Sequence, residues 1–246
     1  MTREILHCPN LTELSRGAAT LVVKRARQCV AERGLFTLVL SGGKTPLGLY
    51  EMLGQPPYLS QMPWAETHLF WGDERCVPPD SPHSNFGAAQ ATMLVKAPLP
   101  PENIHRMQGE LPPPQGAEAY QVELQQFFGA TSDCFPPFDL VLLGMGANGH
   151  TASLFPGSPL LEETQRWVVF TPPGGEPPLS RLTLSFPVIN QAREVLFLVS
   201  GENKREAVRA ILASPDNATH LPAARVHPQE HLCWMLDDST LSDRRG

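Results

Sequence analysis

Short apolar runs that alternate with amphipathic segments are the feature that most limits how this chain can fold. Residues 17–33 repeat their apolar side chains about every 3.6 residues, and Gly34 follows as a stop, which predicts a helix. Such alternation along a whole chain is typical of an α/β fold with a doubly wound, mostly parallel sheet. Strands are expected at 36–41, 67–71, 138–144, 167–170, 181–186, 194–200 and 231–236, and further helices at 46–53, 86–95, 116–128 and 202–213.

The arrangement is Rossmann-like, and residues 1–246 are expected to form a single α/β domain, because neither a repeat nor a composition break divides them. A net charge of −6 without a basic block argues against nucleic acid and anionic membranes as partners. No apolar run approaches the roughly 20 residues of a membrane span. The five cysteines are odd in number and lack C-x-x-C spacing, so we expect a reduced, cytoplasmic protein.

The stretch VLLGMGANGHTASLFPG (141–157) carries the G-x-G-x-x-G spacing of a dinucleotide-binding loop, beginning at Gly144 after a predicted strand. A dinucleotide loop also needs a long helix after its last glycine and an acidic residue at the end of the next strand. Here Pro156 and Pro159 limit any helix to one or two turns, and the next strand ends without an acid. The sequence therefore disfavours a nicotinamide or flavin at this loop.

His150 follows Gly149 directly in this loop. An imidazole ionises near neutral pH and is the usual general base, although a lone histidine is more often structural. Its place at the end of a strand favours the catalytic interpretation. His227 and His231 have i,i+4 spacing, but Pro228 interrupts the segment and no third ligand is evident, so no metal site is expected.

The stretch SGGKTP (41–46) follows the first predicted strand and lacks the first glycine of a full nucleotide loop. Gly42 and Gly43 allow backbone N–H groups to approach a ligand, while Thr45 is suited to an N-cap and Pro46 to the first helical position. The stretch is therefore either an anion site at a helix N-terminus or an ordinary glycine turn.

Two lysines stand at predicted strand-to-helix junctions, where a positive charge is unfavourable for the helix. Lys44 and Lys204 lie where helices are expected to begin, and a cation there costs a few tenths of a kcal/mol to ~1 kcal/mol unless an anion is bound. Asp73, Glu74 and Arg75 follow the second strand, where carboxylates and an anion clamp are useful. A solvated Gly-Asp turn is the alternative for this second group.

Five segments of the chain together resemble the 6-phosphogluconolactonase family, in the family's order: residues 40–53, 71–94, 138–161, 181–190 and 200–208. The resemblance implies hydrolysis of 6-phospho-D-glucono-1,5-lactone in the oxidative pentose phosphate pathway. It also implies a fold like that of glucosamine-6-phosphate deaminase, no cofactor, and a small-molecule partner. The oligomeric state is left open as a monomer or a small homo-oligomer.

By motif, His150 corresponds to the family's general base, and Asp73 and Arg75 are the other catalytic candidates. Asn148 departs from the pattern, since the family's loop usually reads Gly-x-Asp-Gly-His. Arg75 also belongs to the candidate phosphate and substrate site, whose other members are Ser41, Gly42, Gly43, Lys44, Thr45, Gly149, Arg181 and Lys204.

Two alternatives use a similar scaffold. In a glucosamine-6-phosphate deaminase/isomerase, the sequence after the second strand looks like Asp-Glu-Tyr, and the histidine loop continues toward Asn-Glu-Pro. This chain has Asp73-Glu74-Arg75 and SLFPG at these places. A non-catalytic sugar-phosphate-binding domain would usually carry a DNA-binding segment. None is evident before the first strand, which is expected to start by about residue 36.

Overall fold

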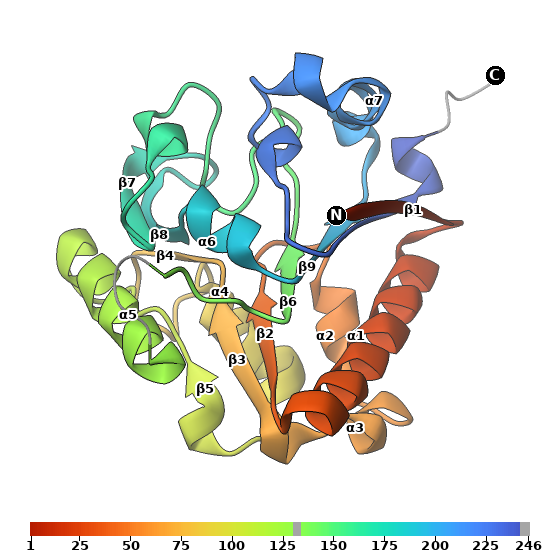
Figure 1. Cartoon of the computed structure of the whole chain (residues 1–246), viewed down its shortest axis with the longest axis vertical. Helices are drawn as coiled ribbons and strands as arrows, with labels where there is room; N and C mark the ends of the chain where they lie inside the picture. The colour runs from red at the N-terminus through yellow and green to blue at the C-terminus, as the bar shows by residue number, and fades with distance from the viewer. Residues whose placement is uncertain (130–133, 242–246) are drawn as a thin grey trace.

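The computed structural model describes residues 1–129 and 134–241 and contains a large parallel sheet and a small antiparallel one (Figure 1). The large sheet confirms the predicted α/β fold. In spatial order its strands are β1 (Thr2–Cys8), β10 (His231–Asp237), β9 (Glu194–Val199), β6 (Leu140–Leu143), β2 (Phe36–Leu40), β3 (Thr67–Trp71) and β5 (Ile104–His105). The small sheet has the order β4 (Asp73–Arg75), β8 (Leu179–Leu184) and β7 (Val168–Gly174).

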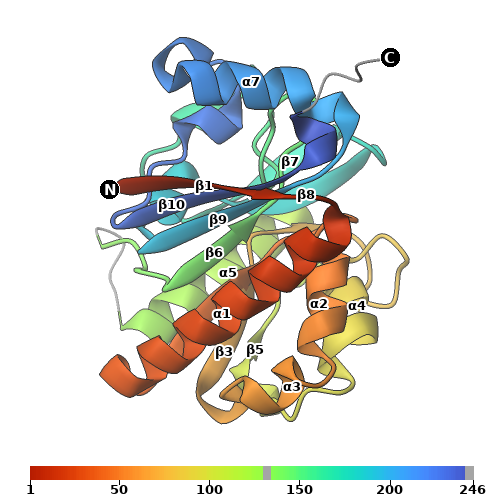
Figure 2. The ribbon, with the colours of Figure 1, turned by 90° about the vertical axis from the view of Figure 1, so that its right-hand side faces the viewer.

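Helices cover both faces of the large sheet. They are α1 (Leu11–Arg33), α2 (Leu47–Leu53), α3 (Tyr58–Gln61), α4 (Asn85–Ala89), α5 (Pro113–Phe128), α6 (Phe186–Gln191) and α7 (Arg205–Ala213), with a π-helical turn at Gln90–Leu94 and short 3₁₀ turns elsewhere. Figure 2 shows α1 and α7 on opposite sides of the sheet. In β10, Met235 lies against Gly17 of α1. The preceding residue, Trp234, lines a pocket with Ile211 of α7. Successive strand residues face opposite layers, so both faces are apolar.

The strand β1 was missed, and the expectation that the first strand starts near residue 36 is wrong. β1 lies at the edge of the sheet and pairs in parallel with β10 along its whole length. Most of its residues are exposed, including Ile5. An exposed edge strand needs no continuous apolar run, so the pattern that identified β2 and β6, which are buried throughout, is absent here.

The apolar runs at 167–170 and 181–186 do form strands, but not in the parallel sheet. They are β7 and β8, which pair antiparallel with each other, and β4 pairs antiparallel with β8. Asp73, Glu74 and Arg75 thus lie in a strand rather than in the loop that we expected. An apolar run reports burial and does not identify the partner strand.

Helix boundaries follow local capping chemistry. In α1 the side chain of Asn10 accepts a hydrogen bond from the Glu13 N–H, so the helix begins earlier than predicted, and Gly34 ends it with a φ of 80° as expected. The expected N-cap at Thr45 is wrong, because α2 begins at Leu47 with Pro46 in the cap position and no side-chain cap.

A hydrogen-bonded chain of two histidines and a glutamate lies where β3 and β5 meet α5. His68 Nδ1 is 3.1 Å from His105 Nε2, and His105 Nδ1 is 2.9 Å from Glu123 Oε1. A carboxylate accepts hydrogen bonds, so His105 Nδ1 carries a hydrogen and its Nε2 accepts one from His68. Burial, and then the neighbouring His105, lower the pKa of His68 below its ordinary value.

The lowered pKa of His68 predicts that part of the stability of the fold is lost in acid. Because the folded state binds a proton at His68 less readily than the unfolded chain does, His68 favours folding above its ordinary pKa of 6.5, and this contribution is lost as the pH falls below that value. His68→Phe should therefore make the free energy of unfolding fall less between about pH 7 and about pH 5. Urea unfolding across that range measures the effect, and an unchanged pH dependence would contradict it.

In the described part of the chain, no helix combines the length and the apolar character that crossing a membrane requires.

Candidate active site

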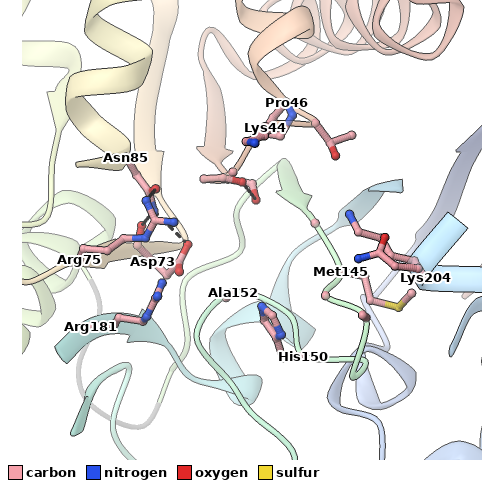
Figure 3. Close-up of a pocket in the computed structure, with 18 residues that line it drawn as sticks. Lys44, Pro46, Asp73, Arg75, Asn85, Met145, His150, Ala152, Arg181 and Lys204 are labelled. Carbon is pink, nitrogen blue, oxygen red and sulfur yellow. Dashed lines mark hydrogen bonds between the residues drawn. The ribbon is translucent and has the colours of Figure 1, made fainter. Parts of the chain in front are cut away.

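A cavity of about 240 Å³ opens where the loops after β2, β6 and β9 meet the small sheet (Figure 3). Ligands of open α/β sheets bind at the carboxyl ends of the strands, and this cavity lies there. Ten predicted site residues line it: Ser41, Gly42, Gly43, Lys44, Thr45, Asp73, Arg75, His150, Arg181 and Lys204. Gly149 is not among the lining residues.

The loop after β2 is fixed at its start by a tyrosine of α2. The Ser41 N–H donates to Tyr50 Oη (2.9 Å), and Tyr50 Oη donates to the Ser41 carbonyl (2.7 Å). Gly43 adopts a φ of 93°, a conformation that favours glycine, and so turns the chain toward the cavity. Lys44 follows as an exposed cation at the cavity's edge.

Pairing of β4 with β8 places two arginines side by side, because Arg75 lies directly opposite Arg181. Arg181 is only 5% exposed and donates through Nη2 to the carbonyls of Glu176 and Pro177. The Nε atoms of both arginines are buried and have no hydrogen-bond partner among the described residues. Like charges opposite each other in a sheet are destabilising, so this pair favours an anionic ligand.

Asp73 is buried on the same wall of the cavity. Its Oδ2 accepts a hydrogen bond of 2.6 Å from the Ser153 hydroxyl, and its Oδ1 lies 3.3 Å from the side-chain nitrogen of Asn85. These contacts hold the carboxylate still. A direct orienting role of Asp73 toward His150 stays a prediction.

The imidazole of His150 is oriented by Asn148. His150 Nδ1 lies 2.6 Å from Asn148 Oδ1, and the His150 backbone N–H donates to the same oxygen at 3.2 Å. Because an amide oxygen accepts and does not donate, Nδ1 carries the hydrogen, and the lone pair of the neutral ring is on Nε2. The ring also packs against Phe155, at 4.7 Å between centroids. This is the tautomer of a base that acts through Nε2.

The glycines of this loop make room for the His150 ring and allow the turn that carries it. A Cβ at Gly146 would lie 2.1 Å from His150 Cε1, so the imidazole occupies the space above that residue. Gly149 has a φ of 75°, its N–H donates to the Gly146 carbonyl, and a Cβ there would meet Leu221 at 2.8 Å. Gly149 therefore shapes the loop, and its N–H points at the chain instead of at a ligand.

Comparison with known proteins adds an independent observation to this geometry. The sequence model of the family described as glucosamine-6-phosphate isomerases/6-phosphogluconolactonase matches residues 9–234. The chain belongs to this family. Two relatives are proteins named 6-phosphogluconolactonase: one from Synechocystis sp., 42% identical over 89% of each chain, and one from Nostoc sp., 38% identical over 96% of this chain and 95% of the relative.

Solved structures of the family share the fold. The 6-phosphogluconolactonase of Thermotoga maritima superposes with a TM-score of 0.83 at 31% identity and covers 96% of this chain and 100% of its own. A monomeric glucosamine-6-phosphate deaminase superposes with a TM-score of 0.79 at 22% identity, over 96% of this chain and 98% of its own. The predicted similarity to the deaminase fold is thus confirmed, and at this identity the likeness concerns the fold alone.

Burial favours the neutral form of the His150 imidazole. Desolvation lowers the pKa of His150, Asp73 opposes this shift, and the positive charges of Arg181 and Lys204 add to it. Lys204 lies in the 3₁₀ turn after β9, just ahead of α7, and burial lowers the pKa of its ammonium group while Asp237 opposes the shift. The neutral form of His150 is favoured, as a base requires.

Asn148→Asp should raise the pKa of His150. The substitution keeps the acceptor at Nδ1 but adds a negative charge beside the ring, which stabilises the imidazolium form. NMR titration of the His150 ring in both proteins measures the difference. Equal titration midpoints would show that the charge of residue 148 does not reach the imidazole.

Sequence reasoning missed Asn85 and Asn203, which also line the cavity. Asn85 is buried at the start of α4 rather than in a loop after a strand, and Asn203 is an exposed uncharged residue next to Lys204, so neither carries a sequence signature of its own. His227 and His231 do not come together as a metal site, and the described residues contain no group of three His, Cys, Asp or Glu side chains that could hold a metal ion.

Proposed function

We propose that this chain, folded as one α/β domain, hydrolyses 6-phospho-D-glucono-1,5-lactone to 6-phospho-D-gluconate. One observation carries the proposal: a histidine with its Nε2 lone pair free stands in a cavity bordered by four cationic side chains, Lys44, Arg75, Arg181 and Lys204. A base and a surplus of positive charge fit a phosphorylated ester. The relatives named 6-phosphogluconolactonase support the same substrate.

The proposed reaction begins with water. His150 Nε2 takes a proton from the water as its oxygen attacks the lactone carbonyl carbon, and negative charge develops on the carbonyl oxygen. Arg75 or N–H groups of the loop stabilise that oxyanion. The tetrahedral intermediate then breaks the bond to the ring oxygen, which takes the proton back from the imidazolium. The product acid loses a proton at neutral pH. No electrons are transferred to a carrier, so this chemistry requires no redox cofactor.

The remote phosphate positions the ring in this mechanism. Lys44, Arg181 and Lys204, with the loop from Ser41 to Thr45, hold the phosphate and the sugar oxygens. Binding energy from a group that does not react is converted into orientation at the carbonyl, which lowers the entropic part of the barrier. A lactone without the phosphate should therefore lose both affinity and turnover.

The test is a lactone-opening assay coupled to oxidation of the 6-phosphogluconate formed, with the spontaneous rate subtracted. We expect acceleration well above background for the phosphorylated lactone and much less for glucono-1,5-lactone. Ammonia release from glucosamine-6-phosphate is measured in parallel and is expected to be absent. Binding of sugar phosphates without turnover, or ammonia release in place of lactone opening, would overturn the proposal.

A further inference from the structure

The side chain of Asn85 stands between a cation and an anion of the cavity wall. Asn85 is the first residue of α4 and is 4% exposed. Its Oδ1 accepts a hydrogen bond of 2.7 Å from Arg75 Nη1, and its Nδ2 donates to the Asp73 carbonyl at 2.8 Å and approaches Asp73 Oδ1 at 3.3 Å. Figure 3 shows Asn85, Arg75 and Asp73 close together on one side of the cavity.

An amide fits this place because its two ends differ. A guanidinium donates hydrogen bonds only and a carboxylate accepts them only, so one orientation of the Asn85 amide satisfies both neighbours. An aspartate would face Asp73 without a donor. The amide also packs closely against Gly42, since a Cβ there would be 2.1 Å from Asn85 Oδ1.

The backbone beneath Asn85 is held by a buried carboxylate. Glu74 is 2% exposed, and its Oε1 accepts from the N–H groups of Asn85 and Arg75, both at 2.7 Å. Its Oε2 accepts from the Phe86 N–H and the Ser84 hydroxyl. Burial raises the pKa of Glu74, whereas these hydrogen bonds favour its charged form. One side chain thus fixes the start of α4 to the strand that carries Arg75.

We propose that Asn85 is a positioning residue that acts as a neutral spacer and prevents Arg75 from pairing with Asp73. A guanidinium and a carboxylate form a strong bidentate pair when they meet, and that pair would use up the charge of Arg75. The amide satisfies both groups without neutralising either. Arg75 therefore keeps its positive charge available to an anionic group of the ligand. This inference rests on the proposed function.

Calorimetric titration with inorganic phosphate and with 6-phosphogluconate tests the spacer. Asn85→Asp gives Arg75 a permanent ionic partner, and we expect the affinity for both probes to fall roughly 10- to 100-fold. Asn85→Ala lets Arg75 reach Asp73 and should lower affinity about tenfold. In the lactone assay KM should rise, because Arg75 no longer offers its full charge to the ligand.

A double-mutant cycle separates a spacer from a merely structural residue. If Asn85 acts by keeping Arg75 off Asp73, Asn85→Ala should cost much less affinity in an Asp73→Asn background than in the wild-type background. Asn103→Ala is the matched control, since Asn103 is also buried and its Nδ2 donates to the carbonyls of Ala65 and Thr67. That control should lower the melting temperature and leave phosphate affinity unchanged.

The outcomes distinguish this inference from the function on which it rests. Wild-type affinity in both Asn85 variants, or equal costs of Asn85→Ala in the two backgrounds, would overturn the spacer while lactone opening by the wild type still stands. A wild-type protein that binds neither probe would overturn both. A raised KM together with a cost that depends on Asp73 supports the spacer.

Discussion

Replacing His150 with alanine should slow lactone opening by roughly 10²–10⁴-fold while the protein stays folded. The imidazole is the group in the cavity whose neutral form accepts a proton near neutral pH, and its Nε2 is free because Asn148 occupies Nδ1. The substitution removes the contact of the ring with Phe155 and its hydrogen bond to Asn148. Coupled turnover assays, corrected for spontaneous opening, measure the loss, and thermal unfolding verifies the fold.

The pH dependence gives this first prediction a second readout. Since the pKa of His150 is lowered from 6.5 by burial, kcat/KM should fall on the acidic side below that value as the imidazole becomes protonated. That acidic limb should disappear with His150→Ala. His7→Ala, in the exposed edge strand, is the control and should keep the wild-type rate. Near-wild-type turnover without His150 would remove it from the role of base.

Gly146→Ala should be nearly as damaging, although it changes no polar group. The new methyl group would lie 2.1 Å from His150 Cε1 and 2.2 Å from Nδ1, so the ring must leave its place over the loop. Displacing a base by about 1 Å is enough to cost on the order of 10²-fold in rate. We expect kcat to fall by that order, with a smaller effect on phosphate binding.

Gly17→Ala is the matched control for this glycine. Its Cβ would meet only the side chain of Met235, at an ordinary 3.5 Å, and it lies in α1 away from the cavity. The control should turn over lactone as the wild type does. If Gly146→Ala also did so, the imidazole would have another productive position, and its close contact with Gly146 would not be needed for catalysis.

The alternation of apolar runs and helices was enough to predict the parallel sheet, because strands such as β2 and β6 are buried on both faces and must be apolar throughout. It could not predict β1, whose edge position permits exposed residues. It also could not separate β7 and β8 from the large sheet. Which strands pair is settled by contacts distant in sequence, such as Arg75 with Arg181.

The lining of the cavity was predicted where charged or titratable residues lie in the loops after strands, as His150 and Lys44 do. That these residues lie together could be predicted, because the carboxyl ends of parallel strands meet at one edge of the sheet. The hydrogen bonds of Asn85 were not predictable, since they join α4 to β4 through side-chain geometry. Gly149 was predicted as part of the substrate site, but it does not line the cavity and its N–H donates to the Gly146 carbonyl, because spacing alone does not tell where an N–H points.

The cavity lies between two separately paired sheets, and this division has a consequence for the protein without its ligand. Asp73, Arg75 and Arg181 come from the small sheet, whereas Lys44, His150 and Lys204 come from loops of the large one. An anion that touches both sets acts as a removable cross-link and relieves the repulsion among the cations. By mass action, a ligand that binds only the folded state raises its stability. The resistance of the folded chain to unfolding should therefore follow the concentration of sugar phosphate around it.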